Sequence, residues 1–472
     1  QSGLYKIDYS YLINHGIIDG PTPSSQLHLY SNNQGLLNTE NGTFRPDDLM
    51  QRTLHINDGN DGNFSSGDYV LFYHNGSDRV EMDNGKYRHV NHIYSDSAYC
   101  FLGIGTGATN STDSINNLNQ NYNQEINEFW DFAYINEDKI NLLKSGAIWL
   151  GDVFDLTNQY TYDLPFSNLS DSSLLRLRVV SKSSATPASF NLSLFGQNRT
   201  IAINGSGSSY LSDAGRAAVV EYPFVNNLNS NFQVDLTYNN NGSPSAKGYL
   251  DYIEVNCKRQ LIVDNSSFNF RLSSDNSAWS KINLQNSNSV QMIWDITDLN
   301  NVKNLVFEQD GNNLFFIEEI DSLKSYIAIS GNSFPYPTFV KRVESQNLHG
   351  LSSADVIIIT NSKFTQSAAR LKTFHEQEGL SVHVVTDQQI YNEFSSGMRD
   401  ATALKQFLRM FYVRGSGIPN QIPKYCVLIG DGTYDNRNIL DHGNNLLPVF
   451  ESQESLSKVN TFATDDFFAI LS

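Results

Sequence analysis

The periodicity of the apolar residues changes near residue 350, and this change constrains the fold more than any other feature of the chain. Before it, strand-like segments are short and alternate apolar with polar residues, as DYVLFYHNG does at 68–76. After it, DVIIIT at 355–360, VHVVTD at 382–387 and KYCVLIG at 424–430 are continuous apolar runs, which are typical of buried parallel strands. Helical patterns separate these runs, so we predict a parallel α/β sheet with right-handed crossovers in the C-terminal part.

The chain is long enough for three domains, since its 472 residues compare with roughly 100–200 residues for an average domain. We predict a β-rich N-terminal domain at 1–150, a β-sandwich-type region at 151–345 and the α/β unit at 346–472. Regularly spaced strands in the second region are typical of antiparallel sandwiches. Two prolines in SFPYPTFVKRV, at 333–343, mark the last boundary. The predicted fold class is therefore multidomain, with antiparallel sandwiches followed by a parallel α/β sheet.

Two helices are expected in the α/β unit. One carries an apolar stripe that ends before Gly379, a natural helix stop, and the stripe consists of Phe364, Ala368, Leu371 and Phe374. The other follows Asp400, whose carboxylate can cap its first turn.

The net charge of the chain argues against nucleic acid as a partner. Lys and Arg number 32 against 50 Asp and Glu, which gives −18 at pH 7, and such a field repels phosphate backbones. The sequence contains no apolar run of the length that a transmembrane helix requires. It begins Gln-Ser-Gly without a signal-peptide pattern, so either the protein is not exported or its signal has been removed. The many Asn-rich loops favour export.

The three cysteines do not form a recognisable site. Cys100, Cys257 and Cys426 occur without a C-x-x-C motif or neighbouring His clusters, so neither a disulfide framework nor a zinc site is expected. Cys426 lies within the apolar run at 424–430, where a cysteine is usually a small buried hydrophobe. His375 and His383 fall in a predicted helix and a predicted strand, so we cannot assemble a nucleophile and base from these residues.

Acidic residues supply the candidate binding positions. Asp431 and Asp435 follow a predicted parallel strand, and open α/β sheets bind ligands at the carboxyl ends of such strands. Their oxygen-rich loop could hold calcium, as could Asp58–Gly62, although turn formation explains the latter well; no other cofactor is expected. Asp465 and Asp466 could hold a cationic side chain or a metal, cap a helix, or belong to a solvated turn.

Several long motifs resemble one family of enzymes. They are YNEFSSGMRDATALKQFLRMFYVRG, IPKYCVLIGDGTYDNRN, LLPVFESQESLS and TFATDDFFAIL in the C-terminal part, and GNFSSGDYVLFYHNG, HIYSDSAYCFLG and INLLKSGAIWLGDVF in the N-terminal part. In this order they resemble the gingipain-type cysteine peptidases, and within that family most closely the cell-surface sortases of the type IX secretion system.

The resemblance implies an activity and a place for the catalytic residues. These sortases remove the C-terminal targeting domain from secreted cargo and transfer the new carboxyl end to a lipopolysaccharide-type acceptor. Their catalytic half has a caspase-like fold of two subdomains, with a His and a following Cys in the second. This chain would hold the first subdomain only, with the dyad expected beyond Ser472, and should be inactive alone. Asp465 matches an acidic position that binds a basic substrate side chain, and we assign Asp466 and Asp431 to substrate binding with it.

The resemblance also implies partners and a location. The expected partners are the outer-membrane barrel shuttle protein PorV and the C-terminal domains of secreted cargo. The expected location is the cell surface, associated with the outer membrane, after removal of a signal peptide. The alternative is a non-catalytic surface protein whose aromatic-rich β-domains bind glycan or protein.

Overall fold

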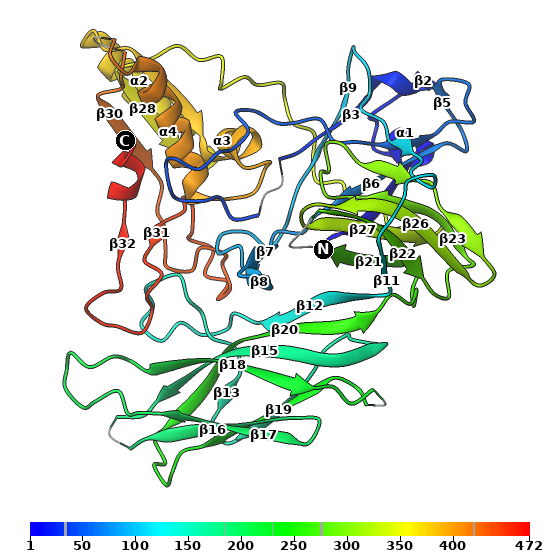
Figure 1. Cartoon of the computed structure of the whole chain (residues 1–472). Helices are drawn as coiled ribbons and strands as arrows, with labels where there is room; N and C mark the ends of the chain where they lie inside the picture. Colours follow the sequence, from blue (N-terminus) through cyan, green and yellow to red (C-terminus); the bar gives the residue numbers. More distant parts are fainter. Residues whose placement is uncertain (33–34, 185, 229, 274–276, 419–420) are drawn as a thin grey trace.

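The computed structural model describes residues 1–472 apart from 33–34, 185, 229, 274–276 and 419–420. Its parts follow one another by colour in Figure 1: a blue N-terminal unit, a cyan and green sandwich, a green second sandwich, and a yellow-to-red α/β unit. The predicted fold class is confirmed, since mostly antiparallel sheets precede one parallel sheet. No helix among the described residues is long and apolar enough to cross a membrane.

The N-terminal unit consists of small antiparallel sheets and one short helix. Its elements are β1 (Gly3–Asp8), α1 (Tyr9–Asn14), β2 (Thr22–Pro23), η1 (Ser24–Gln26), β3 (Leu27–Tyr30), β4 (His55–Asn57), β5 (Asn63–Phe64), β6 (Tyr69–His74), β7 (Arg79–Asp83), β8 (Lys86–Val90) and β9 (Phe101–Ile104). The largest sheet has the order β1-β6-β4. Helix α1 starts directly after β1 because the Asp8 carboxylate accepts the N–H of Tyr11 at 2.8 Å.

The first sandwich packs two antiparallel sheets around a continuous apolar core. Its strands are β12 (Glu128–Asn136), β13 (Val153–Phe154), β14 (Gln159–Asp163), β15 (Leu169–Lys182), β16 (Ala188–Leu194), β17 (Gln197–Ile203), β18 (Arg216–Val225), β19 (Gln233–Asn239) and β20 (Lys247–Gln260). The sheets have the orders β12-β20-β15-β18 and β14-β19-β16-β17. Alternate residues of each strand, such as Leu175, Leu177 and Val179 of β15, are fully buried in the core, as a half-buried strand requires.

The second sandwich has the same layered construction. Its strands are β10 (Asp113–Ile115), β11 (Gln124–Ile126), β21 (Ser267–Leu272), β22 (Ala278–Leu284), β23 (Val290–Asp295), β24 (Lys303–Leu305), β25 (Glu308–Asp310), β26 (Asn313–Ile320) and β27 (Lys324–Ser330). Sheets β10-β24-β23-β27-β21 and β11-β22-β26-β25 enclose a core rich in aromatic rings, including Phe270, Phe316 and Tyr326. The short strands β10 and β11 join these sheets in parallel.

Strands from the first 150 residues complete sheets formed by later residues. Strand β12 pairs with β20 over nine residues, from Glu128 to Asn136. The hairpin β7–β8 lies against the same sheet, where His89 contacts the buried carboxylate of Glu254 at 2.8 Å. The division at residues 150 and 345 stays a prediction about independent folding, which these pairings do not test.

The α/β unit is a three-stranded parallel sheet with helices on both faces. Its elements are β28 (Val356–Thr360), η2 (Ser362–Phe364), α2 (Thr365–Gln377), β29 (Val382–Thr386), α3 (Asp387–Phe394), α4 (Ala401–Gly415), β30 (Tyr425–Ile429), β31 (Phe450–Glu451), β32 (Ala463–Thr464) and η3 (Asp466–Ala469). The order is β29-β28-β30, and every residue of the central β28 is buried. Asp400 caps α4 by accepting the N–H of Thr402 at 2.7 Å, as predicted. A capping box of Thr386 and Gln389 starts α3.

The two faces and the edge of this sheet are covered unequally. Helices α3 and α4 bury one face in a large core, whereas α2 buries only Ala368 and leaves Phe374 55% exposed. Strand β30 lies at one end of the sheet order with Tyr425 and Cys426 exposed. The expectation of a buried Cys426 was therefore wrong, because an apolar run indicates a strand of the sheet but does not say whether that strand is central or at the edge.

Candidate functional site

The carboxyl end of the parallel sheet leads into the long loop that was singled out from the sequence. Asp431 follows β30, and its carbonyl oxygen accepts the N–H groups of Leu446 and Leu447 at 2.8 and 2.9 Å, which closes the loop. Its carboxylate is exposed and accepts only the N–H of the next residue, Gly432, at 3.0 Å. Asp431 is thus available to solvent at the edge of the sheet where α/β proteins bind ligands.

Asp435 has a different role. Its side chain is 2% exposed, and its two carboxylate oxygens accept the N–H groups of Ile439 and Leu440, both at 2.7 Å. These bonds occupy the carboxylate in shaping the turn 435–441. Asp435 therefore builds the loop that presents Asp431. The loop Asp58–Gly62 is likewise a series of Asx turns, in which Asp58 and Asp61 accept N–H groups two residues further on.

Asp465 and Asp466 lie on the surface above an anchored aromatic pair. Both carboxylates are exposed. Asp465 precedes η3 and Asp466 is its first residue, and Phe467 and Phe468 of η3 are buried. Phe467 stacks on Phe450 with ring centroids 3.9 Å apart, and the Lys405 ammonium lies 4.4 Å from the Phe467 ring. The anchor fixes the two acids in position without using their oxygens. Among the described residues, Asp431, Asp465 and Asp466 do not approach closely enough to share a metal ion, so their joint role in substrate binding stays a prediction.

Cys426 and His383 of the α/β unit lie too far apart for a catalytic pair. Cys426 and His383 both pair with Ile357, one from each side, so they are separated by two strand spacings, about 10 Å. His383 Nε2 contacts the carbonyl oxygen of Ser352 at 2.8 Å. Cys426 thus has no base within hydrogen-bond reach in the part of the chain that the structure describes.

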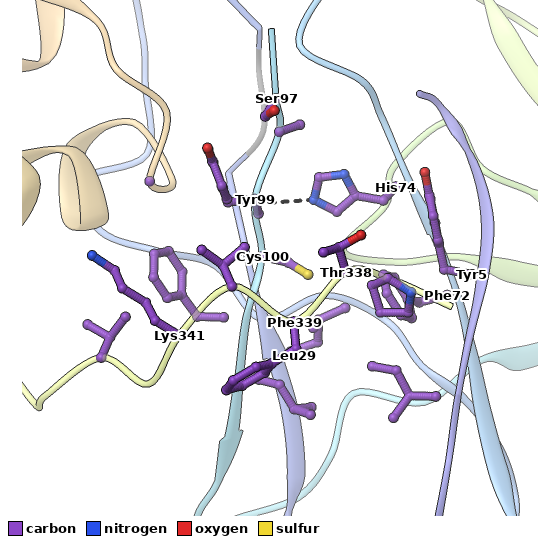
Figure 2. Close-up of a pocket in the computed structure, with 18 of the residues that line it drawn as sticks. Tyr5, Leu29, Phe72, His74, Ser97, Tyr99, Cys100, Thr338, Phe339 and Lys341 are labelled. Carbon is purple, nitrogen blue, oxygen red and sulfur yellow. Dashed lines mark hydrogen bonds between the residues drawn. The ribbon is translucent and has the colours of Figure 1, made fainter. Parts of the chain in front are cut away.

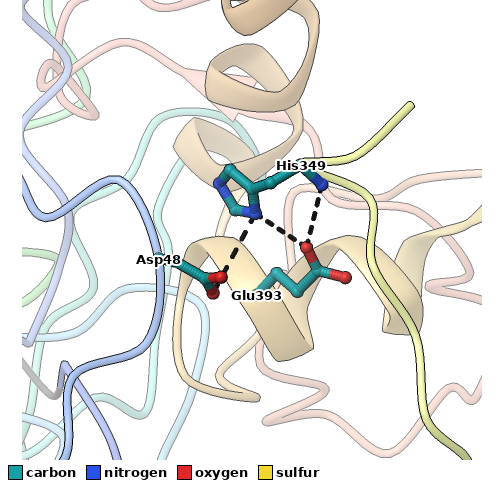
Figure 3. A group of neighbouring side chains, drawn as sticks. All are labelled: Asp48, His349 and Glu393. Carbon is teal, nitrogen blue, oxygen red and sulfur yellow. Dashed lines mark hydrogen bonds and ion pairs between the residues drawn. The ribbon is translucent and has the colours of Figure 1, made fainter. Parts of the chain in front are cut away.

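The structure brings together three residues that the sequence did not assign. Asp48, His349 and Glu393 come from the N-terminal unit, the segment before β28 and helix α3, and their ligand atoms lie within 4.8 Å of one another. His349 Nδ1 lies 2.7 Å from Glu393 and 4.0 Å from Asp48 (Figure 3). Because the three residues are widely separated in sequence, no local motif predicts that they lie together.

The Glu393 carboxylate is already saturated, which argues that this group is structural. It accepts N–H groups from Leu348, His349 and the Gln346 amide in addition to the imidazole. Burial opposes its charge, but the His349 imidazole and these donors together lower the pKa of Glu393 to about 2. Burial also opposes a charged His349, yet Glu393 and then Asp48 raise the pKa of the imidazole. A buried ion pair of this kind ties the segment before β28 to α3.

A second unpredicted group joins the loop after β30 to the first sandwich. Glu451 is 2% exposed and accepts the N–H of Gly146 at 3.0 Å. Burial, to which the nearby Asp435 adds, raises the pKa of Glu451 to about 8. Trp149 stacks on Tyr434 with ring centroids 5.7 Å apart and planes 11° from parallel. The β-rich part of the chain before the α/β unit, which we call the accessory region, therefore holds in place the loops that follow the parallel sheet.

Comparison with known proteins relates the α/β unit to one family of peptidases. Residues 349–472 match peptidase family C25, the gingipain family. Over its full length the chain is similar to the crystal structure of dimeric latent PorU from Porphyromonas gingivalis, with a TM-score of 0.85 at 22% identity. The match covers 100% of this chain and 45% of PorU, so the chain spans less than half the length of that protein. The resemblance predicted from the motifs is confirmed, and the chain has the fold of the corresponding part of PorU.

Other comparisons add little. A carbohydrate-binding domain, CBM36-1 of a xylanase from the hindgut metagenome of Trinervitermes trinervoides, matches 26% of this chain and 96% of its own, with 16% identity and a TM-score of 0.17. The Cry4Aa toxin from Bacillus thuringiensis matches 54% of this chain and 58% of its own, with 12% identity and a TM-score of 0.19. Neither similarity carries an argument about function. The search of curated proteins found no match.

Proposed function

We propose that this chain forms the accessory region and first catalytic subdomain of a cysteine peptidase that acts as a cell-surface sortase of the type IX secretion system. The enzyme would remove the C-terminal targeting domain of secreted cargo and transfer the cargo to a lipopolysaccharide-type acceptor. The observation that carries the proposal is the agreement of this chain with the fold of part of PorU, together with the C25 match at residues 349–472.

In this proposal the chain supplies the substrate side of the cleft. Asp431, Asp465 and Asp466 expose their carboxylates on the loop and short helix that follow β30. Free carboxylates at such a place attract and orient a cationic group of an extended substrate. The edge of β30, where Tyr425 is 60% exposed and Cys426 is also exposed, offers a surface on which a further strand can pair.

The catalytic dyad is proposed to lie on sequence outside these 472 residues. The proposal is supported by the greater length of PorU and by the separation of Cys426 from His383 on opposite sides of β28. In the complete enzyme a thiolate would attack the scissile carbonyl while a histidine protonates the leaving amine, and the resulting thioester would be resolved by water or by an acceptor amine. The chain described here would position the substrate for that attack.

The proposed partners follow from the same family assignment. The outer-membrane barrel shuttle protein PorV would hold the enzyme at the cell surface, and the C-terminal domains of cargo would be its substrates. The β-rich units make up most of the chain and lie beside and below the α/β unit in Figure 1. We therefore propose that they carry the docking surface.

A gene deletion in the organism that carries this protein tests the proposal. Intact-mass analysis of secreted cargo should then show uncleaved C-terminal domains and loss of surface attachment, and restoring the gene should reverse both. Cargo of unchanged mass and attachment would overturn the proposal. The same measurement on the native polypeptide should give a mass well above that of 472 residues. The purified 472-residue chain should show no thiol-sensitive cleavage of a peptide that spans a cargo junction.

A further inference from the structure

A large cavity lies where the N-terminal unit meets the α/β unit, away from the acids discussed above. It has a volume of about 1100 Å³, and its lining includes aromatic and aliphatic side chains of the N-terminal unit, among them Tyr5, Phe72, Cys100 and Leu102. Gln388 and Asn392 of α3 lie at its border. This volume exceeds the roughly 300–1,000 Å³ of pockets that bind small molecules, and it suits a chain of several residues better than a compact metabolite.

One wall of the cavity is an extended segment, residues 335–345, which we call the strap. The strap belongs to no helix or strand. Two contacts with the N-terminal unit fix its first half: Tyr336 stacks on Tyr11 with ring centroids 5.9 Å apart, and Phe339 contacts His15 at 4.6 Å. Figure 2 shows Thr338 and Phe339 of the strap beside Cys100 and Phe72, whereas the Lys341 side chain points away from them. The strap therefore forms one wall of the cavity.

The backbone of the strap is unpaired over seven consecutive residues. Prolines 335 and 337 lack an N–H group, and their carbonyl oxygens accept from Lys6 N–H and Tyr11 Oη at 2.9 and 3.0 Å. From Thr338 to Glu344 no backbone N–H or carbonyl group has a hydrogen-bond partner within the described part of the chain. Seven extended residues span about 23 Å. The strap therefore presents a row of main-chain donors and acceptors, as the free edge of a sheet does.

The cavity is lined by both apolar and polar side chains. Exposed charged residues, among them Asp96, Lys341 and Glu344, belong to its lining, whereas both His74 nitrogens already face the carbonyl oxygens of Asn75 and Tyr99. The main chain of the strap adds a continuous row of donors and acceptors to these separate side chains. A cavity beside an unpaired backbone edge is the arrangement that binds an extended peptide by strand addition, with alternate side chains buried.

We propose that this cavity binds an extended segment of a partner polypeptide, which pairs its backbone with residues 338–344 and buries apolar side chains at alternate positions against Leu102 and Ile104. The proposal does not depend on peptidase activity, and it can be tested on the 472-residue chain itself.

The direct test is binding of a designed peptide. The probe is fluorescein-labelled Thr-Val-Thr-Phe-Thr-Val-Thr, followed by fluorescence anisotropy, and its control is the same peptide N-methylated at the three apolar residues, which removes their donors. We expect saturable binding, weakened at least about tenfold by N-methylation, because the methylated residues can no longer donate hydrogen bonds to the strap. No saturable binding, or equal binding of the methylated peptide, would overturn the proposal.

Variants locate the binding. Thr338→Trp should fill the cavity. Val340→Pro should remove a backbone N–H that has no partner in the described part of the chain. Each variant should therefore bind the probe at least about fivefold more weakly. Val459→Trp, at a position 66% exposed and outside the cavity, is the matched control and should bind normally. In a Cys426→Ser background the bound peptide should slow alkylation of Cys100. Unaltered binding by both cavity variants would contradict the assignment, provided that circular dichroism shows them folded.

Two further outcomes would also reject the peptide. A dodecyl-chain fluorophore that binds the cavity more tightly than the peptide, and that Thr338→Trp displaces, would assign the site to an acyl chain. Self-association of the chain that Thr338→Trp abolishes, measured by sedimentation velocity, would assign it to a second copy of the protein.

Discussion

The guanidinium of Arg437 pairs with the carboxylate of Asp138, a residue 299 positions earlier in the chain. Both side chains are nearly buried, at 12% and 8% exposure, and Arg437 also contacts Asp96 at 2.9 Å. Burial raises the pKa of Asp138, and Arg437 opposes this rise. The pair joins the loop after β30 to the segment that leads from β12 into β13, so the accessory region and the α/β unit share a buried charge pair.

Replacement of Arg437 should destabilise the protein strongly. Arg437→Met leaves the buried Asp138 carboxylate with only the Asn91 amide as a close polar partner, and loss of one partner of a buried pair typically costs about 3–5 kcal/mol. Urea unfolding should report this loss. Adding Asp138→Asn should recover a large part of it, because the uncompensated charge is then gone. Simple additivity of the two losses would contradict the pairing.

Gly146→Ala should disrupt the contact between the same two regions. Gly146 has φ 81°, and a Cβ atom there would collide with the carbonyl oxygen of Glu454. The matched control is Gly242→Ala, where φ is 79° but nothing lies within 4 Å of the added atom. Backbone strain at positive φ should lower the free energy of unfolding of the control by about 1 kcal/mol. Gly146→Ala should lower it by at least about 3 kcal/mol, as measured by urea unfolding. Equal losses in the two variants would show that the close contact is unimportant.

Glu451 should make stability fall as the pH rises. Its folded pKa of about 8 lies above the ordinary value of 4.5, so between these values the folded chain keeps a proton that the unfolded chain releases. The free energy of unfolding should therefore decrease across this window by at least about 2 kcal/mol from this group. Glu451→Gln should remove the decrease and be more stable than the parent protein at about pH 8.

The exposed residue Glu308 provides the control, and Glu308→Gln should leave the pH profile of urea unfolding unchanged. A Glu451→Gln profile parallel to that of the parent protein would contradict burial of a protonated carboxyl group at this position.

The pair of His349 and Glu393 should contribute most in mildly acidic solution. The contribution of Glu393 is present above its ordinary pKa of 4.5 and is lost as the pH falls toward about 2. That of His349 is present below its ordinary value of 6.5 and is lost as the pH rises through its raised folded pKa. The destabilisation caused by His349→Gln should therefore be largest between about pH 4.5 and 6.5 and shrink at higher pH.

Chelation should leave this group unaffected. EDTA should not change the melting temperature of the parent protein, because the carboxylate of Glu393 is already occupied by N–H donors. A zinc-dependent rise in melting temperature that His349→Gln abolishes would instead identify Asp48, His349 and Glu393 as metal ligands.

The sequence by itself determined the elements whose signals are local. Continuous apolar runs correctly located β28, β29 and β30, and Asp400 was recognised as the cap of α4. The alternating segment at 68–76 located β6. These features depend on residues a few positions apart, whose periodicity and capping chemistry can be read along the chain. The family motifs were visible for the same reason, since each occupies one continuous stretch.

Only the tertiary structure decided the environment of each functional group. It buried the Asp435 side chain inside its loop and left Asp431 and Asp465 exposed to solvent. It also placed Cys426 on an edge strand of the sheet. It also paired Arg437 with Asp138 and His349 with Glu393, and opened the cavity beside the strap. Whether a carboxylate is solvated, saturated by N–H groups or buried beside an opposite charge depends on segments that meet across hundreds of residues. Local sequence does not specify those meetings.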